Sequence, residues 1–249
     1  MLIGSGQHDG IGIWLATTPK SLTHLKRYPQ LVQDLWQASR LKEFSSILAK
    51  QAVEVVDRSS LPSNAIVVPL NWVFKIKSDG TFKSRLVVMG HLMPRDDSID
   101  VTSPTPRLAN VRFMLAIAIK LGMEVELADI DTAFTYASPH TTIYCPCPGG
   151  LYLDGRLLGK FLHLLKNLYG ADSAPRMFHN LLHNWFIANG FDVNPHEPCL
   201  YVCWTGEAPI FVLVHVDDCI IVSSQSQIDD FMQDQNQGNL RHQGAWTSG

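Results

Sequence analysis

Two adjacent aspartates, Asp217 and Asp218, interrupt a run of apolar residues in the last quarter of the sequence. They lie between the segments IFVLV and CIIV, whose composition is typical of buried strands. A pair of carboxylates inside such a run is costly unless it is exposed at a turn, paired with a cation or bound to a metal ion. A hairpin turn is one interpretation, although Asp-Asp is not the Asn-Gly or Asp-Gly dipeptide that tight turns prefer.

A second pair of aspartates, Asp129 and Asp131, lies in the segment VELADIDTAF, which is expected to be a short strand. Their spacing of two places both side chains on the same face of that strand. If this strand is a neighbour of the strand that holds Asp217, carboxylates from distant parts of the chain converge. Hard oxygen ligands of this kind, without nearby histidine, favour Mg²⁺ or Mn²⁺ and leave coordination positions for substrate phosphates. The sequence therefore predicts phosphoryl transfer with two metal ions.

A locally positive segment could bind those phosphates. Two β-rich runs, NAIVVPLNWVFKIK and TFKSRLVVM, are joined at residues 78–80 and predict a β-hairpin. Residues 71–95 contain one acidic residue, Asp79. The same segment contains five basic residues: Lys75, Lys77, Lys83, Arg85 and Arg95. Such a hairpin would hold a triphosphate by charge neutralisation. Aromatic residues alternate with the lysines, and core packing is predicted for at least two of the three: Trp72, Phe74 and Phe82.

Composition limits the class of protein. The chain has 249 residues, of which 17% are charged, and a formal net charge of −3, which excludes a disordered chain and a uniformly basic nucleic-acid coat. Five cysteines, an odd number, fit a reducing compartment better than a disulfide framework. Neither a secretory signal nor a transmembrane segment is expected, so we predict an intracellular protein, cytoplasmic or nuclear, without a membrane partner.

The order of predicted elements indicates an α+β fold. Helices are expected at residues 34–52, 107–121 and 173–190, with Gly122 and Gly190 as C-terminal caps. Strands are expected at residues 125–130, 161–165, 199–204 and 210–223, and a turn at 205–209. This alternation predicts an antiparallel sheet with helices on one face. The polar tail after Ser224 is expected to contribute no core residues.

Several motifs together resemble a known family. The strings KIKSDGTFKSRLVVMGHL, SPTPRLANVRFMLAIAIKLGMEVELADIDTAF, LKNLYGADSAPRMF, EPCLYV and VHVDDCIIV occur in this order. They resemble the reverse transcriptases of Ty1/copia-type LTR retrotransposons over residues 36–224.

The resemblance implies a division of the chain. Residues 36–110 would form a fingers segment with the β-hairpin, and residues 111–224 would form a polymerase palm. Residues 1–35 stay unassigned, and residues 225–249 would be a truncated polar tail. Thumb and RNase H domains are expected to be missing, so the sequence resembles a piece of a larger polyprotein, with integrase and RNase H segments as further partners.

The resemblance also implies the chemistry. The chain would be an RNA-directed DNA polymerase, a nucleotidyltransferase that adds deoxynucleotides to a primer 3′-hydroxyl on an RNA or DNA template. Asp129, Asp217 and Asp218 would be catalytic and would bind two Mg²⁺ or Mn²⁺ ions, while Asp131 is not needed as a ligand. Phe134 would lie beneath the incoming sugar and exclude a 2′-hydroxyl. Further nucleotide-binding positions are implied at Lys75, Lys77, Arg85, Tyr169 and Gly170.

Two departures from the family pattern, together with the expected absence of a thumb and an RNase H domain, leave alternatives open. His215 stands where the family usually has tyrosine, and residues 171–173 are Ala-Asp-Ser where a leucine, a basic residue and glutamine are common. One alternative is a retrotransposon-derived relic that binds nucleic acid but is weakly active or inactive. A more distant one is an RNA-recognition-like binding module without catalytic descent.

Overall fold

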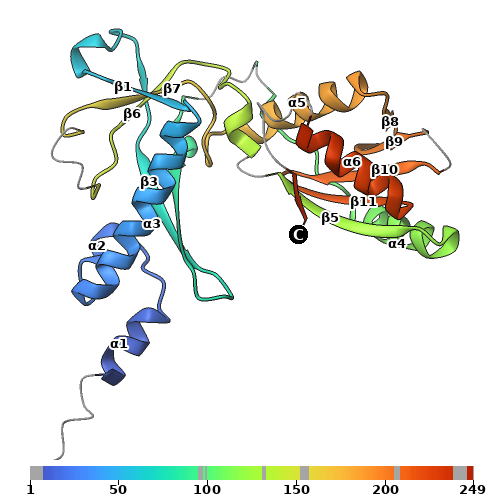
Figure 1. Ribbon diagram of the computed structural model, residues 1–249. Coiled ribbons are helices and arrows are strands. Elements are labelled where there is room, and N and C mark those ends of the chain that lie inside the picture. Colours follow the sequence, from blue (N-terminus) through green and yellow to red (C-terminus); the bar gives the residue numbers. More distant parts are fainter. Residues whose placement is uncertain are drawn as a thin grey trace, which may run out of the picture. The chain divides into compact units, whose positions relative to one another are not determined.

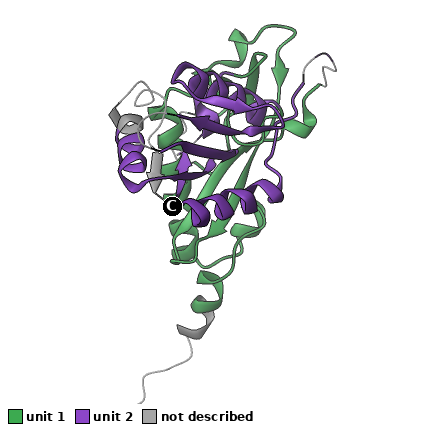
Figure 2. Ribbon diagram, turned by 90° about the vertical axis from the view of Figure 1, so that its right-hand side faces the viewer, with its two compact units in different colours: residues 1–96, 139–172 green, residues 97–138, 173–249 purple. Residues whose placement is uncertain are grey.

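The computed structural model (Figure 1) describes residues 8–94, 98, 100–130, 133–151, 157–204, 208–237 and 246–248. Asp131, Arg95 and most of the predicted turn at 205–209 lie outside the described residues. The chain divides into two compact units (Figure 2): unit 1 comprises residues 1–96 and 139–172, and unit 2 comprises residues 97–138 and 173–249. These boundaries differ from the expected ones, because residues 139–172 pack with unit 1 and residues 97–110 with unit 2.

Unit 1 contains a helical segment, a β-hairpin and a four-stranded sheet. Its helices are α1 (His8–Leu15), α2 (Leu22–Leu25), α3 (Gln30–Ala49), η1 (Arg58–Ser60) and η2 (Gly90–Leu92). The hairpin pairs β3 (Leu70–Ile76) with β4 (Phe82–Val88), as predicted. The mixed sheet has the order β1 (Val53–Val56), β7 (Phe161–Leu164), β6 (Ile143–Pro146), β2 (Ile66–Val67).

The core of unit 1 lies between α3 and the hairpin. Trp36 of α3 makes edge contacts with Phe74 and Phe82, at ring-centroid distances of 5.0 and 4.6 Å. Trp72 is also buried, so the predicted core role of at least two hairpin aromatics is confirmed. One face of the hairpin is thereby covered by the helix, and the other carries the lysines.

Unit 2 is built on one six-stranded antiparallel sheet. The strand order is β12 (Trp246–Ser248), β5 (Glu124–Ile130), β11 (Asp218–Ser223), β10 (Ile210–His215), β9 (Glu197–Cys203), β8 (Asp192–Asn194). Its helices are α4 (Leu108–Leu121), η3 (Ala133–Tyr136), α5 (Ala174–Ala188) and α6 (Gln225–Gln237). Gly122 has the left-handed φ of 63° that the predicted cap requires. Within the described ranges, no helix has the length and apolar composition needed to cross a bilayer.

Helices cover both faces of this sheet, so the prediction of helices on one face is wrong (Figure 1). Met114 and Ala118 of α4 pack in a cluster with Leu213 of β10. On the opposite face, the ring of Phe186 of α5 stacks on that of Tyr201 of β9, with the ring centroids 4.3 Å apart. The physical reason is that β10 is apolar on both sides, since consecutive residues from Val212 to Val214 are buried.

The tail after Ser224 contributes to the core, contrary to expectation. Ile228 and Phe231 of α6 are buried, and the Phe231 ring contacts Trp185 and Phe191. Polar residues dominate α6, but Ile228 and Phe231 are three residues apart and therefore share one helix face.

Replacing Phe231 by alanine tests this packing. Phe231→Ala is expected to lower the free energy of unfolding of unit 2 by about 3 kcal/mol, because it leaves a cavity among aromatic rings. Gln233→Ala on the exposed side of α6 is the control, with an expected change within about 0.5 kcal/mol. Urea unfolding followed by circular dichroism measures both. Equal stabilities of the two variants would show that α6 does not pack as described.

Candidate active site

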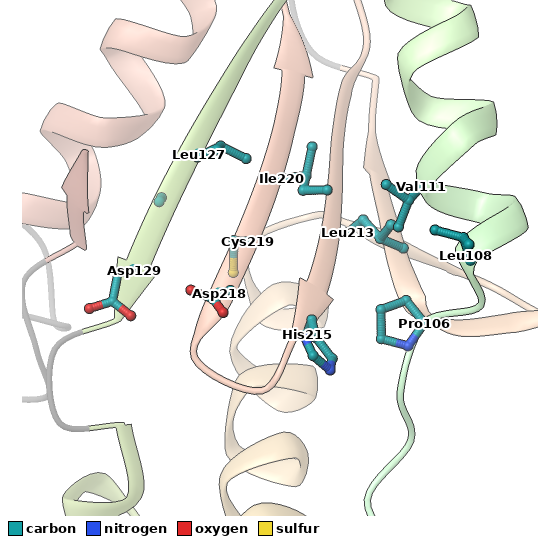
Figure 3. A pocket seen from close by; sticks show the side chains of 11 residues that line it. Pro106, Leu108, Val111, Leu127, Asp129, Leu213, His215, Asp218, Cys219 and Ile220 are labelled. Atoms are coloured by element: carbon teal, nitrogen blue, oxygen red, sulfur yellow. The ribbon is translucent and has the colours of Figure 1, made fainter. Parts of the chain in front are cut away.

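The pairing of β5 with β11 brings two aspartates together. Asp218 is directly opposite Asp129 in this antiparallel pair, and Figure 3 shows both carboxylates at the same end of the neighbouring strands. Directly opposed residues have Cβ atoms about 4.5–5.5 Å apart. The prediction that these distant parts of the sequence form neighbouring strands is confirmed.

Asp217 lies in the turn between β10 and β11. The turn consists of Val216 and Asp217, and it is closed by the pairing of His215 with Asp218. Val216 has a φ of 61°, which is unfavourable for a β-branched residue. The carbonyl oxygen of Asp217 accepts a hydrogen bond from Ile130 N at 2.9 Å, which ties the turn to the end of β5. The hairpin-turn interpretation is thus correct for Asp217, while Asp218 already belongs to the strand.

The three aspartates raise the pKa of one buried thiol, that of Cys219. Burial raises the pKa of Cys219, and the negative charges of Asp218, Asp217 and Asp129 raise it further. Carboxylates from β5, the turn and β11 therefore create a shared negative potential at this end of the sheet. A cation at this position would relieve the repulsion between them.

The two opposed carboxylates suit a hard divalent cation, although the described residues supply few ligands. In the part of the chain that the structure describes, no three His, Cys, Asp or Glu side chains form a group that could hold a metal ion. Asp129 and Asp218 provide two opposed carboxylates, and Asp131 lies outside the described residues. Mg²⁺ commonly takes one or two carboxylates from the protein and the remaining oxygens from water and substrate phosphates. The described residues fit that pattern of incomplete coordination.

A cavity of about 540 Å³ adjoins the two carboxylates. Asp129, Asp218 and His215 line its polar part (Figure 3). Its apolar walls come from the sheet and from the start of α4, and include Leu127, Leu213, Ile220, Pro106, Leu108 and Val111. Sequence reasoning did not identify the α4 residues as part of the site. One signal in the sequence was that the predicted helix at 107–121 is apolar on most of its faces. A helix that packs against a single surface needs only one apolar face.

Phe134 lies in η3, shortly after β5. Its side chain is 8% exposed and makes an edge contact with Phe178 of α5, with ring centroids 6.2 Å apart. The ring is therefore fixed in position within the same unit as the aspartates.

The implied nucleotide-binding residues of unit 1 gather around the hairpin. The guanidinium of Arg85 lies 4.5 Å from the centre of the Tyr169 ring. Lys75 is exposed, opposite Lys83 in the register, and on the same hairpin face as Arg85. Lys77 is exposed in the turn that follows β3.

A half-buried acid beside the hairpin was missed in the sequence. Glu43 of α3 accepts a hydrogen bond from Leu86 N at 3.3 Å. Burial raises the pKa of Glu43, and this backbone bond, Lys83 and Arg85 partly offset the rise. Helical spacing could not reveal this contact, because it joins elements that are distant in sequence.

Gly170 lies where two backbones approach closely. Tyr169 O accepts a hydrogen bond from Val88 N at 2.7 Å, and Gly170 O accepts one from Gly90 N at 3.1 Å. Gly170 has a φ of 84°, and a Cβ on it would collide with the carbonyl oxygen of Val88. This contact holds Tyr169 beside the strand that carries Arg85.

Comparisons with known proteins identify the family of the chain. The family of reverse transcriptases (RNA-dependent DNA polymerases) matches residues 53–240, so the chain belongs to this family. A Pol polyprotein from transposon TNT 1-94 of Nicotiana tabacum, described as retrovirus-related, is 30% identical over 211 residues, which are 82% of this chain and 15% of that protein. A similar polyprotein from transposon RE1 of Arabidopsis thaliana is 26% identical over 200 residues, 78% of this chain and 13% of its own length. The resemblance to copia-type reverse transcriptases is confirmed, and the chain spans about one seventh of these relatives.

Substitution of Gly170 tests the close approach. Gly170→Ala is expected to lower the free energy of unfolding of unit 1 by about 3 kcal/mol, because it adds a collision to the left-handed backbone strain. Gly80 also has a positive φ, of 80°, but no atom lies within 4 Å of its missing Cβ. Gly80→Ala is therefore the matched control and should cost only about 1–2 kcal/mol. Thermal unfolding compares the two, and an equal loss would contradict the described contact.

Proposed function

We propose that this chain is an RNA-directed DNA polymerase domain that transfers deoxynucleotides to a primer 3′-hydroxyl. The observation that carries the proposal is the opposition of Asp129 and Asp218 at one end of neighbouring strands, with Asp217 in the adjoining turn. Membership of the reverse transcriptase family supports it. RNA or DNA template with primer and deoxynucleoside triphosphates are the proposed ligands, and other segments of a Pol polyprotein are proposed partners.

The aspartates would hold two divalent cations together with the substrate. Asp129 and Asp218 face each other across the strands, and Asp217 lies one residue away at the turn. When bound, Mg²⁺ or Mn²⁺ supplies activation of the attacking hydroxyl and charge neutralisation on the leaving pyrophosphate. The chain's own contribution is to hold the carboxylates on rigid strands, so that little reorganisation is needed during transfer.

The β-hairpin carries positive charges that would bind a triphosphate. We propose that Arg85 binds it and that Lys75 and Lys77 assist, while Tyr169 and Gly170 line the nucleotide pocket. Contact with the Tyr169 ring restricts the Arg85 guanidinium, which lowers the entropic cost of binding a phosphate.

Primer extension tests the role of the aspartates. On a poly(rA) template with an oligo(dT) primer and Mg²⁺, Asp218→Asn and Asp217→Asn are expected to reduce kcat by at least about 10²-fold, because the cation loses a charged ligand. Asp192→Asn on the exposed strand β8 is the matched control and should leave the rate within about twofold. Circular dichroism checks that all variants are folded.

The same assay separates the alternative function. The alternative is a chain that binds nucleic acid without extending it, and it is left open by the departures from the family pattern at His215 and at residues 171–173. In that case the wild type would bind labelled primer–template but would extend no primer, and Asp218→Asn would not weaken the binding. This result would refute the polymerase proposal.

Phe134 is proposed to select the sugar. Its ring is fixed against Phe178, so it would block a 2′-hydroxyl sterically. Phe134→Val should raise the incorporation of ribonucleotides relative to deoxynucleotides by about 10- to 100-fold, since removing bulk opens the space for one hydroxyl group. Competition between radiolabelled UTP and dTTP measures this ratio. An unchanged ratio would assign Phe134 to core packing alone.

A further inference from the structure

Glu197, the first residue of β9, is a buried carboxylate outside the aspartate cluster. It is 5% exposed. A carboxylate with so little access to water is costly unless several donors surround it. Its hydrogen-bond partners therefore indicate its role.

The partners of Glu197 come from the start of α4 and from its own strand. Its Oε2 accepts hydrogen bonds from Arg107 N at 3.3 Å and from the side-chain Nδ2 of Asn110. Its Oε1 accepts one from Cys199 N at 3.4 Å. The carboxylate thus connects β9 to the first turn of a helix that lies about 90 residues earlier in the sequence.

This first turn has no cap of its own. The N-cap residue of α4 is Arg107, whose side chain makes no capping bond, and the first turn contains no acidic residue. The free N–H groups and the positive end of the helix dipole favour a nearby carboxylate. Glu197 supplies that carboxylate from another element.

The packing of α4 elsewhere is sparse, so this bond matters for its position. Met114 and Ala118 are the fully buried residues of α4, whereas Leu108 is 63% exposed and Ile119 is 84% exposed. A helix with so few buried contacts is weakly fixed by packing alone. The hydrogen bonds of Glu197 therefore add to the packing of Val111 in fixing the N-terminal end of α4.

The same turn forms a wall of the cavity beside the aspartates. Leu108 and Val111 of this turn line the cavity together with Pro106, which lies just before the helix, and Asp218 (Figure 3). The wall is apolar, which suits the sugar and base faces of a nucleotide rather than its phosphates.

We propose that Glu197 is a positioning residue that fixes the first turn of α4 and so the apolar wall next to Asp218. The proposal rests on the proposed polymerase function and adds to it, because the wall would contact the primer end. Loss of the carboxylate is then expected to weaken productive binding of primer–template more than the chemical step.

Glu197→Gln tests the proposal with two measurements. Amide hydrogen exchange should become about 5- to 10-fold faster at Arg107, Asn110 and Val111 and stay unchanged at Met114, because Arg107 N donates to Glu197, the amides of Asn110 and Val111 donate to Arg107 O, and the core contact stays. The KM for primer–template should rise about fivefold or more while kcat changes less than about twofold. Asp192→Asn, the same acid-to-amide change on neighbouring β8, is the control and should alter neither.

A second variant distinguishes positioning from general loss of folding. Adding Asn110→Asp to Glu197→Gln exchanges the amide and the carboxylate, and it places an acid in the first turn of α4. This double variant should return KM to within about twofold of the wild type, because the link between helix and strand is restored. A merely structural role would lower the active fraction without this change in KM or its rescue.

Each outcome separates the two proposals. Exchange and KM that stay at wild-type values in folded Glu197→Gln would overturn the role of Glu197 while leaving the polymerase function intact. A wild-type chain that extends no primer would overturn both the function and this role in it, and the exchange rates would still show whether Glu197 caps α4.

Discussion

The site depends on one unfavourable arrangement, two carboxylates held directly opposite each other on neighbouring strands. Like charges at such positions destabilise a sheet. The apolar pairing of β5 with β11 nevertheless imposes it, because Cys219 lies opposite Ala128 and Ile220 opposite Leu127. A one-residue shift of register would turn Asp218 from the cavity to the opposite face of the sheet, which α5 and α6 cover, so the sheet cannot relieve the repulsion by sliding. A bound cation would relieve the repulsion without moving the backbone.

The turn between β10 and β11 has a strained backbone, and this turn also helps to position the aspartates. A two-residue turn normally uses glycine or asparagine where φ is positive, yet here Val216 takes that conformation. The strain places Asp217 at the tip and Asp218 in the strand, beside Asp129. Strained residues persist where the surrounding structure determines them, and the bond between Ile130 N and Asp217 O is part of that structure.

Local patterns could predict the hairpin, the helix at 107–121 with its C-terminal cap Gly122, and the adjacent aspartates, because each depends on residues that are close in sequence. The strand β6 could not be predicted, since Pro146 and the nearby Pro-Gly-Gly run are typical of a loop, and it is the pairing with β7 and β2 that makes this segment extended. The polar composition of α6 likewise concealed its core residues. Contacts such as that of Glu43 with Leu86 N join distant elements, and no single-sequence period encodes them.

Helices on both faces of the sheet have a consequence for the site. The face covered by α5 and α6 is closed by stacked and tilted rings such as Phe186 and Tyr201. The other face holds the aspartates and needs open space, so α4 covers it only in part and leaves the cavity beside Asp218. A helix that must leave this space cannot be fixed by full burial. A polar bond at its end, from a carboxylate on the neighbouring β9, fixes its position without filling the cavity.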